Sequence, residues 1–396
     1  MQVCGVICEY NPFHRGHALH LEKARALSGA DYIVCVMSGP VTQRGSFARH
    51  DKWTRAQAAL SCGADLVLEL PARFACAPAP DFALGGVRLL DLLGVVTHLS
   101  FGCEAESLPL ISQAARILAK ETPEFAAALR SALDRGLPYP RARALAAQQL
   151  GGIPGLAEAV SRPNAALAAE YLQALPPHIL PVPVVREGSG YHDAALSALP
   201  SATAVRAALE GGDLAAALRS VPSPQTLAQA EEAGDIHREE ALSQALLYRL
   251  RTALPETLSG LYGMDEGLEY RFISAARTAS TRQELLSLIK SKRYTHARLS
   301  RICAYVLLDV TRAFADAHRT PTYARILGFR REAQPLLREI KRRSAVPLVA
   351  KAADYDPCDP LFALDIRAQD LWSLGASHPA RRMSGRDFTT SPVIIR

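Results

Sequence analysis

Four short apolar runs alternate with segments of helical periodicity in the first hundred residues. The runs are almost continuously hydrophobic and lie at residues 2–8, 31–37, 65–70 and 95–101. The helical segments lie at residues 17–27, 51–62 and 82–93, with Asp51 as the expected N-cap of the second. Strands that are apolar throughout are typical of a parallel sheet covered on both faces. We therefore expect an α/β fold with a doubly wound, Rossmann-like parallel sheet, which binds ligands beyond the carboxyl ends of its strands.

The pattern changes after these first elements. Residues 106–150 are rich in alanine and leucine at helical spacing, and a short strand is predicted over residues 179–185. Beyond Gly211 and Gly212 the strand signal nearly vanishes, and helix follows helix. The sequence therefore predicts an α/β domain over residues 1–212, followed by a mostly α-helical domain over residues 213–396.

Composition narrows the class of protein. The chain has 396 residues and no run of about 18 apolar residues, so we expect no membrane-spanning helix. Its first residues lack the basic start, apolar stretch and cleavage site of a secretory signal, which favours the cytoplasm. The eight cysteines form no CxxC pair and no close Cys/His cluster, so we predict a reducing compartment and no protein-bound metal.

The positive charge is concentrated in one part of the chain. Residues 286–351 hold fifteen Lys/Arg and four Asp/Glu, a net charge of +11, whereas the whole chain carries +6. Such asymmetry is typical of a surface that binds a polyanion. The alternative is a set of solvated helix faces in an arginine-rich chain.

His14-Arg15-Gly16-His17 lies where the first strand gives way to a helix. Helix N-termini attract phosphates, and a glycine there lets a phosphate approach the backbone closely. Two histidines could then donate hydrogen bonds to an α-phosphate during nucleotidyl transfer. A zinc site is less favoured because no third ligand is close in sequence. The remaining alternative is a solvent-facing pair in a capping turn.

These residues resemble the HxGH motif of the nucleotidyltransferase superfamily, whose enzymes form adenylates from ATP and release pyrophosphate. A second superfamily signature, a Ser/Thr-rich turn ending in arginine, is similar to Ser201-Ala-Thr-Ala-Val-Arg206. On this resemblance Ser201, Thr203 and Arg206 are candidate phosphate contacts. Class I aminoacyl-tRNA synthetases share the first motif, but their lysine-bearing KMSKS loop is not found in this sequence.

A series of longer blocks resembles one family. In order, they are GVICEYNPFHRGHALHL, VMSGPVTQRGSFARHDKWTRAQAALSCGADLVLELP, SFGCE, RPNAALAAEYL, REGSGYHD and KSKRYTHARLSRICAYVLL. Together they are similar to the bacterial tRNA(Met) cytidine acetate ligases. The resemblance implies that ATP and acetate form acetyl-adenylate, with Mg²⁺ on the ATP phosphates. Acetyl is then transferred to the wobble cytidine of elongator tRNA(Met), giving N4-acetylcytidine.

The resemblance also implies an ATP site, with His14 and His17 as catalytic residues that stabilise the α-phosphate. Its residues would be Ile7, Cys8, Glu9, Tyr10, Asn11, Pro12, Phe13, His14, Arg15, Gly16, His17, His20, Gly102, Asn164 and Arg186. Gly102, expected after a strand end, would leave room for the nucleotide, and Arg186 would face its negative charge. Asn164 follows a proline and could instead be a helix N-cap. Pro40 departs from the family pattern in the second loop and removes a backbone donor.

The segment from residue 290 to residue 301 combines cations with an aromatic residue. Its proposed tRNA-binding residues are Lys290, Lys292, Arg293, Arg298 and Arg301. Tyr294 or His296 could stack on an unpaired base, or Tyr294 could pack in the helical core. The alternative to the ligase is a small-molecule adenylyltransferase of cofactor biosynthesis, which would leave the +11 segment without a role. An RNA-binding module with an inactive nucleotide site is disfavoured by the intact His14, Gly16 and His17.

Overall fold

The computed structural model describes residues 1–104, 108–120, 122–185 and 200–396. Within these residues one sheet has the strand order β5-β4-β1-β2-β3-β6-β7, with β8 paired to β6. The strands are β1 Val3–Cys8, β2 Tyr32–Ser38, β3 Leu66–Leu70, β4 His98–Cys103, β5 Leu180–Val185, β6 Ala324–Arg330, β7 Leu348–Val349 and β8 Val393–Ile395. The strands β1 to β5 pair in parallel, and β6 pairs antiparallel to β3. The predicted α/β fold with a doubly wound, mostly parallel sheet is confirmed.

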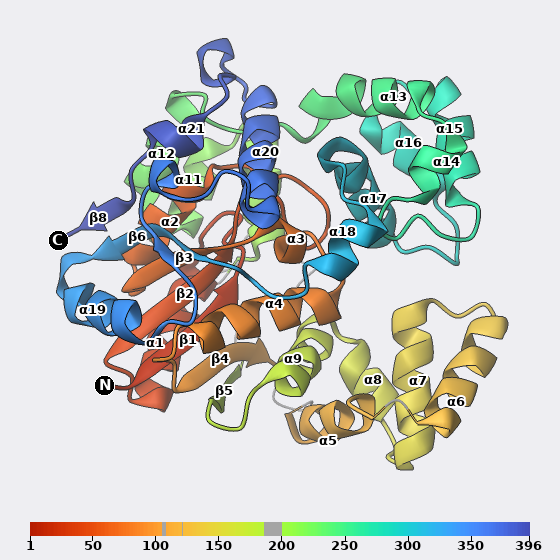
Figure 1. Ribbon diagram of the computed structural model, residues 1–396, viewed down its shortest axis with the longest axis horizontal. Coiled ribbons are helices and arrows are strands. Elements are labelled where there is room, and N and C mark those ends of the chain that lie inside the picture. Colours follow the sequence, from red (N-terminus) through yellow and green to blue (C-terminus); the bar gives the residue numbers. More distant parts are fainter. Residues whose placement is uncertain (105–107, 121, 186–199) are drawn as a thin grey trace.

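Helices cover both faces of this sheet and form two groups beyond it (Figure 1). Those of the first half are α1 Arg15–Ser28, α2 Lys52–Leu60, α3 Ala72–Ala75, α4 Ala79–Leu92, α5 Leu108–Leu118, α6 Pro123–Asp134, α7 Tyr139–Gly151, α8 Leu156–Ser161, α9 Pro163–Ala174, α10 Ala202–Glu210 and α11 Leu214–Ser220. Those of the second half are α12 Pro224–Glu232, α13 Ser243–Thr252, α14 Pro255–Ser259, α15 Leu268–Thr278, α16 Arg282–Ile289, α17 His296–Leu308, α18 Arg312–Ala317, α19 Gln334–Arg343, α20 Pro360–Leu374 and α21 Arg386–Thr389. Figure 1 shows α5 to α8 at the lower right and α13 to α16 at the upper right.

Alternate residues of each strand enter opposite cores, as the two-residue repeat of a strand requires. Val34 and Val36 of β2 pack with α4 and α9 on one face, whereas Ile33 and Cys35 pack with α1 and α2 on the other. The apolar runs are therefore continuous because both faces are buried. Asp51 caps α2 as expected, since its side chain accepts the N–H of Thr54 at 2.6 Å.

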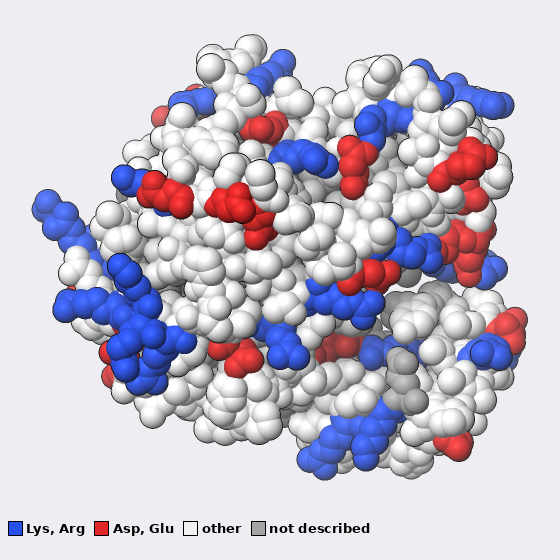
Figure 2. Space-filling model, viewed as in Figure 1, with Lys and Arg blue, Asp and Glu red and all other residues white. Residues whose placement is uncertain are grey.

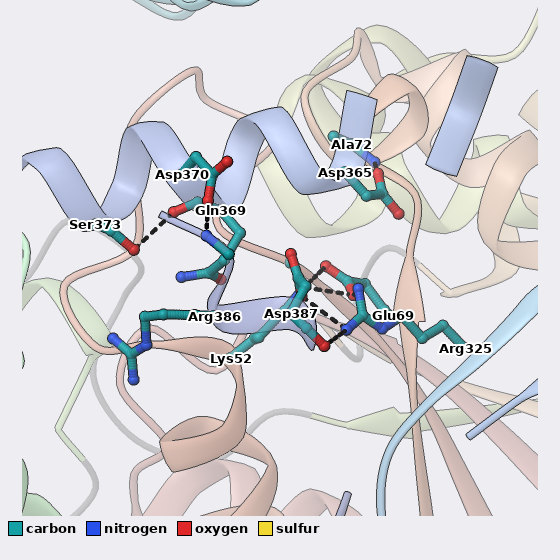
Figure 3. Close-up of polar contacts among 12 residues, drawn as sticks. Lys52, Glu69, Ala72, Arg325, Asp365, Gln369, Asp370, Ser373, Arg386 and Asp387 are labelled. Atoms are coloured by element: carbon teal, nitrogen blue, oxygen red, sulfur yellow. Dashed lines mark hydrogen bonds and ion pairs between the residues drawn. The ribbon is translucent and has the colours of Figure 1, made fainter. Parts of the chain in front are cut away.

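The prediction that strands nearly vanish after residue 212 is wrong, because β6, β7 and β8 join the same sheet. Strand β6 carries Arg325, which is 3% exposed and lies among Lys52, Glu69 and Asp387 (Figure 3). Lys52 Nζ lies 2.8 Å from Glu69 and 2.7 Å from Asp387, and Arg325 contacts the same two carboxylates at 3.5 and 2.7 Å. The chain after residue 212 thus completes the sheet of the first half. No helix of the described residues is long and apolar enough to cross a membrane.

Candidate active site

A pocket of about 290 Å³ opens at the carboxyl ends of β1 and β4, the sheet edge where such folds bind ligands. Fourteen of the predicted site residues line it: Ile7, Cys8, Glu9, Tyr10, Asn11, His14, Gly16, His17, His20, Gly102, Asn164, Ser201, Thr203 and Arg206. Pro12, Phe13 and Arg15 are not among the lining residues. Pro12 and Phe13 are buried, and Arg15 is exposed. Arg186 lies outside the described residues.

The two motif histidines both cap helix α1. The Nδ1 atom of His14 accepts the N–H of Gly16 at 3.1 Å, and that of His17 accepts the N–H of His14 at 3.3 Å. Their rings stack with centroids 3.7 Å apart. Because each Nδ1 accepts a hydrogen bond, a neutral ring carries its proton on Nε2. The pair therefore presents two Nε2–H donors beside the N-terminus of α1.

The alternative interpretation is a solvent-facing pair in a capping turn. The histidines do cap the helix, but His14 does not face solvent. His14 is the N-cap of α1, yet it is only 6% exposed and lines the pocket. No metal cluster of three or more His, Cys, Asp or Glu side chains occurs in the part of the chain that the structure describes.

The loop between β1 and α1 has an irregular backbone. Tyr10 has φ of 49°, in the left-handed region, and the peptide bond between Asn11 and Pro12 is cis. The Asn11 side-chain oxygen accepts the N–H of Arg49 at 2.9 Å, and Tyr10 packs edge-on against Phe13 at 4.7 Å. These contacts determine how the chain turns from β1 into the histidine motif.

Helix α10 brings the second motif to this loop. Ser201 caps α10 by accepting the N–H of Ala204 at 3.1 Å. One turn later, the Arg206 guanidinium donates to the backbone oxygen of Asn11 and to Thr203 Oγ1, the latter at 3.3 Å. Two motifs that lie almost two hundred residues apart in the sequence therefore share one pocket.

The expectations for Gly102 and Asn164 are corrected in detail. Gly102 lies inside β4, where it pairs with Val184, and not after the strand. Asn164 lies in the first turn of α9, whose N-cap is Arg162, so the N-cap interpretation is wrong. Its side-chain amide donates to Glu104 at 3.1 Å. Both residues still reach the pocket wall.

A buried arginine behind the pocket joins its two loops. Arg55 is 2% exposed and donates to four backbone oxygens: Glu9 at 2.8 Å, Ser38 at 2.8 Å, Gly39 at 2.5 Å and His50 at 3.1 Å. The first lies beyond the end of β1, and the next two lie at the end of β2. One guanidinium, with its rigid fork of donors, thus holds both strand ends in register with α2.

Sequence reasoning missed part of the pocket wall. The additional polar residues are Lys23, Thr42, Gln43, Arg44 and Ser46, and Phe82, Phe101 and Tyr171 add aromatic surface. Lys23 follows His17 and His20 at three-residue spacing on α1, a signal that the sequence did contain. Residues 42–46 form a loop that carries no helical or strand periodicity, so only the folded structure reveals its place.

The pocket is suited to an anion. Lys23, Arg44 and Arg206 line it beside the N-terminus of α1, and of the described lining residues only Glu9 carries a carboxylate. That carboxylate already accepts the N–H of Gln43 at 2.6 Å. Burial raises the pKa of Cys8 well above its ordinary value, so this thiol remains neutral.

The proposed tRNA-binding residues differ in how far they are available. Lys290, Lys292 and Arg293 are exposed, although Arg293 pairs with Glu266 at 2.6 Å. Arg298 donates to Gly263 O at 3.2 Å and lies 3.4 Å from Asp265, and Arg301 donates to Gln43 O at 3.1 Å.

Tyr294 packs in the helical core, the alternative to stacking on an RNA base. It is 4% exposed and packs in the core of the helical segment, which comprises α13 to α17, with the Arg298 guanidinium 5.2 Å from its ring centre. Its ring is therefore not available to stack on an RNA base.

Three comparisons with known proteins agree with this geometry. A model of the family described as HIGH Nucleotidyl Transferase matches residues 1–387. The match spans the pocket, the helical segment and every strand of the described sheet except β8. Fold and site together define a nucleotidyltransferase of the HIGH class.

Individual relatives are more specific. The tRNA(Met) cytidine acetate ligase of Syntrophomonas wolfei is 39% identical, over 99% of this chain and 99% of its own. That of Acetivibrio thermocellus is 37% identical, over 100% of both. A crystal structure of Thermotoga maritima TmcAL bound with alpha-thio ATP matches with a TM-score of 0.92 at 31% identity, over 100% of both chains. The chain belongs to the tRNA(Met) cytidine acetate ligase family, which confirms the resemblance seen in the sequence.

Proposed function

We propose that this chain is an ATP-dependent ligase that forms acetyl-adenylate and transfers acetyl to the wobble cytidine of elongator tRNA(Met). The observation that carries the proposal is its full-length similarity to relatives of that name, at 34–39% identity. The pocket supports the first reaction because the two Nε2–H donors and Arg206 converge where a nucleotide's phosphates would lie.

In the first step, an acetate oxygen attacks the α-phosphorus of ATP, and the bond to pyrophosphate breaks. His14 and His17 stabilise the charge that develops on the α-phosphate. Ser201, Thr203 and Arg206 bind the departing phosphates, and Arg186 adds positive charge. Mg²⁺ enters as part of the nucleotide substrate, bound to its phosphate oxygens.

In the second step, the exocyclic amine of cytidine attacks the acetyl carbonyl carbon of acetyl-adenylate. The bond to AMP breaks, and the amine nitrogen loses a proton. The wobble base must leave its stack to reach the pocket, and anticodon-loop bases do so at little cost. The exposed Lys290, Lys292 and Arg293 supply phosphate contacts to the RNA. Because its substrate is a tRNA, we expect the enzyme to act in the cytoplasm.

The test is incubation of the purified protein with ATP, labelled acetate and bulk tRNA, followed by nucleoside analysis of the RNA. We expect label in N4-acetylcytidine that depends on ATP. Acetate-independent turnover of ATP with no label in RNA would instead favour the small-molecule adenylyltransferase. If neither labelled RNA nor turnover of ATP is detected, both functions are contradicted.

A further inference from the structure

The turn at residues 42–46 forms one wall of the pocket mouth. Thr42 N donates to Ser46 O at 2.9 Å, and Gly45 N donates to Thr42 O at 2.9 Å. Gly45 has φ of +79°, a conformation that side chains other than glycine rarely adopt. These bonds place Gln43 and Arg44 at the tip of the turn, and both line the pocket.

The turn is held from two sides by elements far apart in the sequence. On the side of β1, Glu9 accepts the N–H of Gln43 at 2.6 Å. On the side of the helical segment, Arg301 donates to Gln43 O and Arg282 donates to Gly45 O, each at 3.1 Å. A methyl group on Gly45 would lie 2.3 Å from the backbone nitrogen of Arg301, so the turn and the middle of α17 are in close contact.

Within this held backbone, the Arg44 side chain is exposed. Burial lowers the pKa of His296, and the charges of Arg282, Lys290 and Arg44 lower it further. Arg44 therefore lies near the other two cations. Arg282 is itself paired with Glu239 at 2.5 Å, so the exposed positive charge where the pocket mouth meets α16 and α17 comes from Arg44 and Lys290. A rigid turn that presents an arginine beside further cations is suited to bind a phosphate.

We propose that Arg44 binds a backbone phosphate of the RNA next to the nucleotide that enters the pocket, and that Arg301 is a positioning residue for the turn. This inference rests on the proposed function. Two features favour RNA over ATP as the source of the phosphate. In the proposed first step the nucleotide's phosphates are bound by His14, His17 and Arg206, and the turn that carries the exposed Arg44 contacts α16 and α17.

Arg44→Ala separates the two half-reactions. We expect acetate-dependent ATP–pyrophosphate exchange to fall by less than acetyl transfer, because His14, His17 and Arg206 also line the pocket. Acetyl transfer to subsaturating tRNA should fall about tenfold, the change that 1.4 kcal/mol of lost binding produces. Arg319→Ala is the matched control, because it removes one arginine that is 69% exposed and pairs only with the nearby Asp316 among the contacts described.

Arg301→Ala tests the positioning role. Each lost RNA phosphate contact flattens the slope of log K against log salt by about 0.7–0.9. Arg44→Ala should show this flattening, whereas Arg301→Ala should lower the transfer rate and keep the wild-type slope.

Three results would overturn the inference. Equal losses of exchange and transfer in Arg44→Ala would assign the residue to ATP, and no loss of either would remove it from the site. A flattened slope in Arg301→Ala would make that residue a direct RNA contact. If wild type transfers no acetyl to RNA, the proposed function fails, and the salt slopes of tRNA binding still decide whether Arg44 contacts RNA phosphate.

Discussion

His14 uses its two ring nitrogens for different purposes. Its Nδ1 caps helix α1 through the Gly16 N–H, and this bond leaves Nε2 as the donor atom beside the pocket. The same division holds for His17, whose Nδ1 accepts the N–H of His14. Helix capping and the proposed phosphate recognition would therefore use different edges of the same two rings.

Substitutions at these residues can separate the two purposes. Asparagine is a strong N-cap and glutamine fits the third helical position of a capping box, so His14→Asn and His17→Gln should keep the melting temperature near that of wild type. Without an Nε2–H at the α-phosphate, acetyl-adenylate formation should fall about 10²–10³-fold. Acetate-dependent ATP–pyrophosphate exchange measures the loss, with the exposed His178→Asn as control. Wild-type exchange in both variants would remove the histidines from catalysis.

At the scale of elements, strand β6 extends the sheet although its sequence, ARILGFR, carries two arginines. Arg325 can be buried in the sheet because Glu69 of β3 and Asp387 of α21 lie beside it, with Lys52 of α2 (Figure 3). The contacts to Asp387 are ion pairs without hydrogen-bond alignment. Four charges from four elements thus join the second half of the chain to the first.

Removing one member of this cluster should destabilise the whole fold. Lys52→Met leaves two buried carboxylates with Arg325 alone, and breaking a buried pair in this way typically costs about 3–5 kcal/mol. Urea unfolding measures the loss. The double variant Lys52→Met/Glu69→Gln leaves the Arg325–Asp387 pair and should recover part of the free energy of unfolding. A double variant less stable than Lys52→Met would contradict this pairing.

At the scale of the molecule, the helical segment shares a core with the α/β unit. Val41 and Phe47 of the loop after β2 pack in the same apolar cluster as α13 to α17, and Trp372 of α20 donates to Ala48 O at 2.6 Å. The densest group of basic side chains in Figure 2 lies elsewhere, over α19. Its exposed cations are Arg338, Lys341, Arg342 and Arg343. The positive charge of residues 286–351 is therefore not gathered on one surface.

A pair of triple variants tests which surface binds tRNA. We expect Lys290→Ala/Lys292→Ala/Arg293→Ala to weaken tRNA binding and to flatten the salt slope by up to about 0.7–0.9 for each charge. Arg338→Ala/Lys341→Ala/Arg342→Ala removes the same charge from α19 and should change the slope less. Filter binding at several salt concentrations gives both slopes. A larger effect of the α19 variant would move the RNA to that surface.

The contact between the helical segment and the α/β unit also predicts that the stability of the fold depends on pH. His237 stacks on Phe47 at 4.9 Å, and burial lowers its pKa from 6.5 to about 4. Below pH 6.5 the unfolded chain gains a proton that the folded chain does not, so stability falls as the pH drops from 6.5 towards 4. The loss approaches about 3 kcal/mol. Urea unfolding at pH 7 and pH 4.5 should show a smaller loss in His237→Gln, and equal losses would exclude His237 as the cause.

Local sequence patterns predict several strands of the fold and much of the site. Apolar runs located β1 to β5, and the spacing of His14, Gly16 and His17 located the start of α1. Arg44 and Gln43 were missed because a turn without periodicity has no signal of its own. The N-cap interpretation of Asn164 is wrong because α9 starts at Pro163, two residues earlier than a cap at Asn164 would allow.

The sequence by itself determined the parallel sheet, the histidine motif at its edge and the family, because each rests on residues close together in the chain. Only the tertiary structure decided that Arg206 meets Asn11, that Arg301 holds the turn of Arg44 and that β6 completes the sheet. These pairings join residues about two hundred or more positions apart. Their free energy comes from burial and hydrogen bonds that exist only once the distant partner has arrived, so no local pattern encodes them.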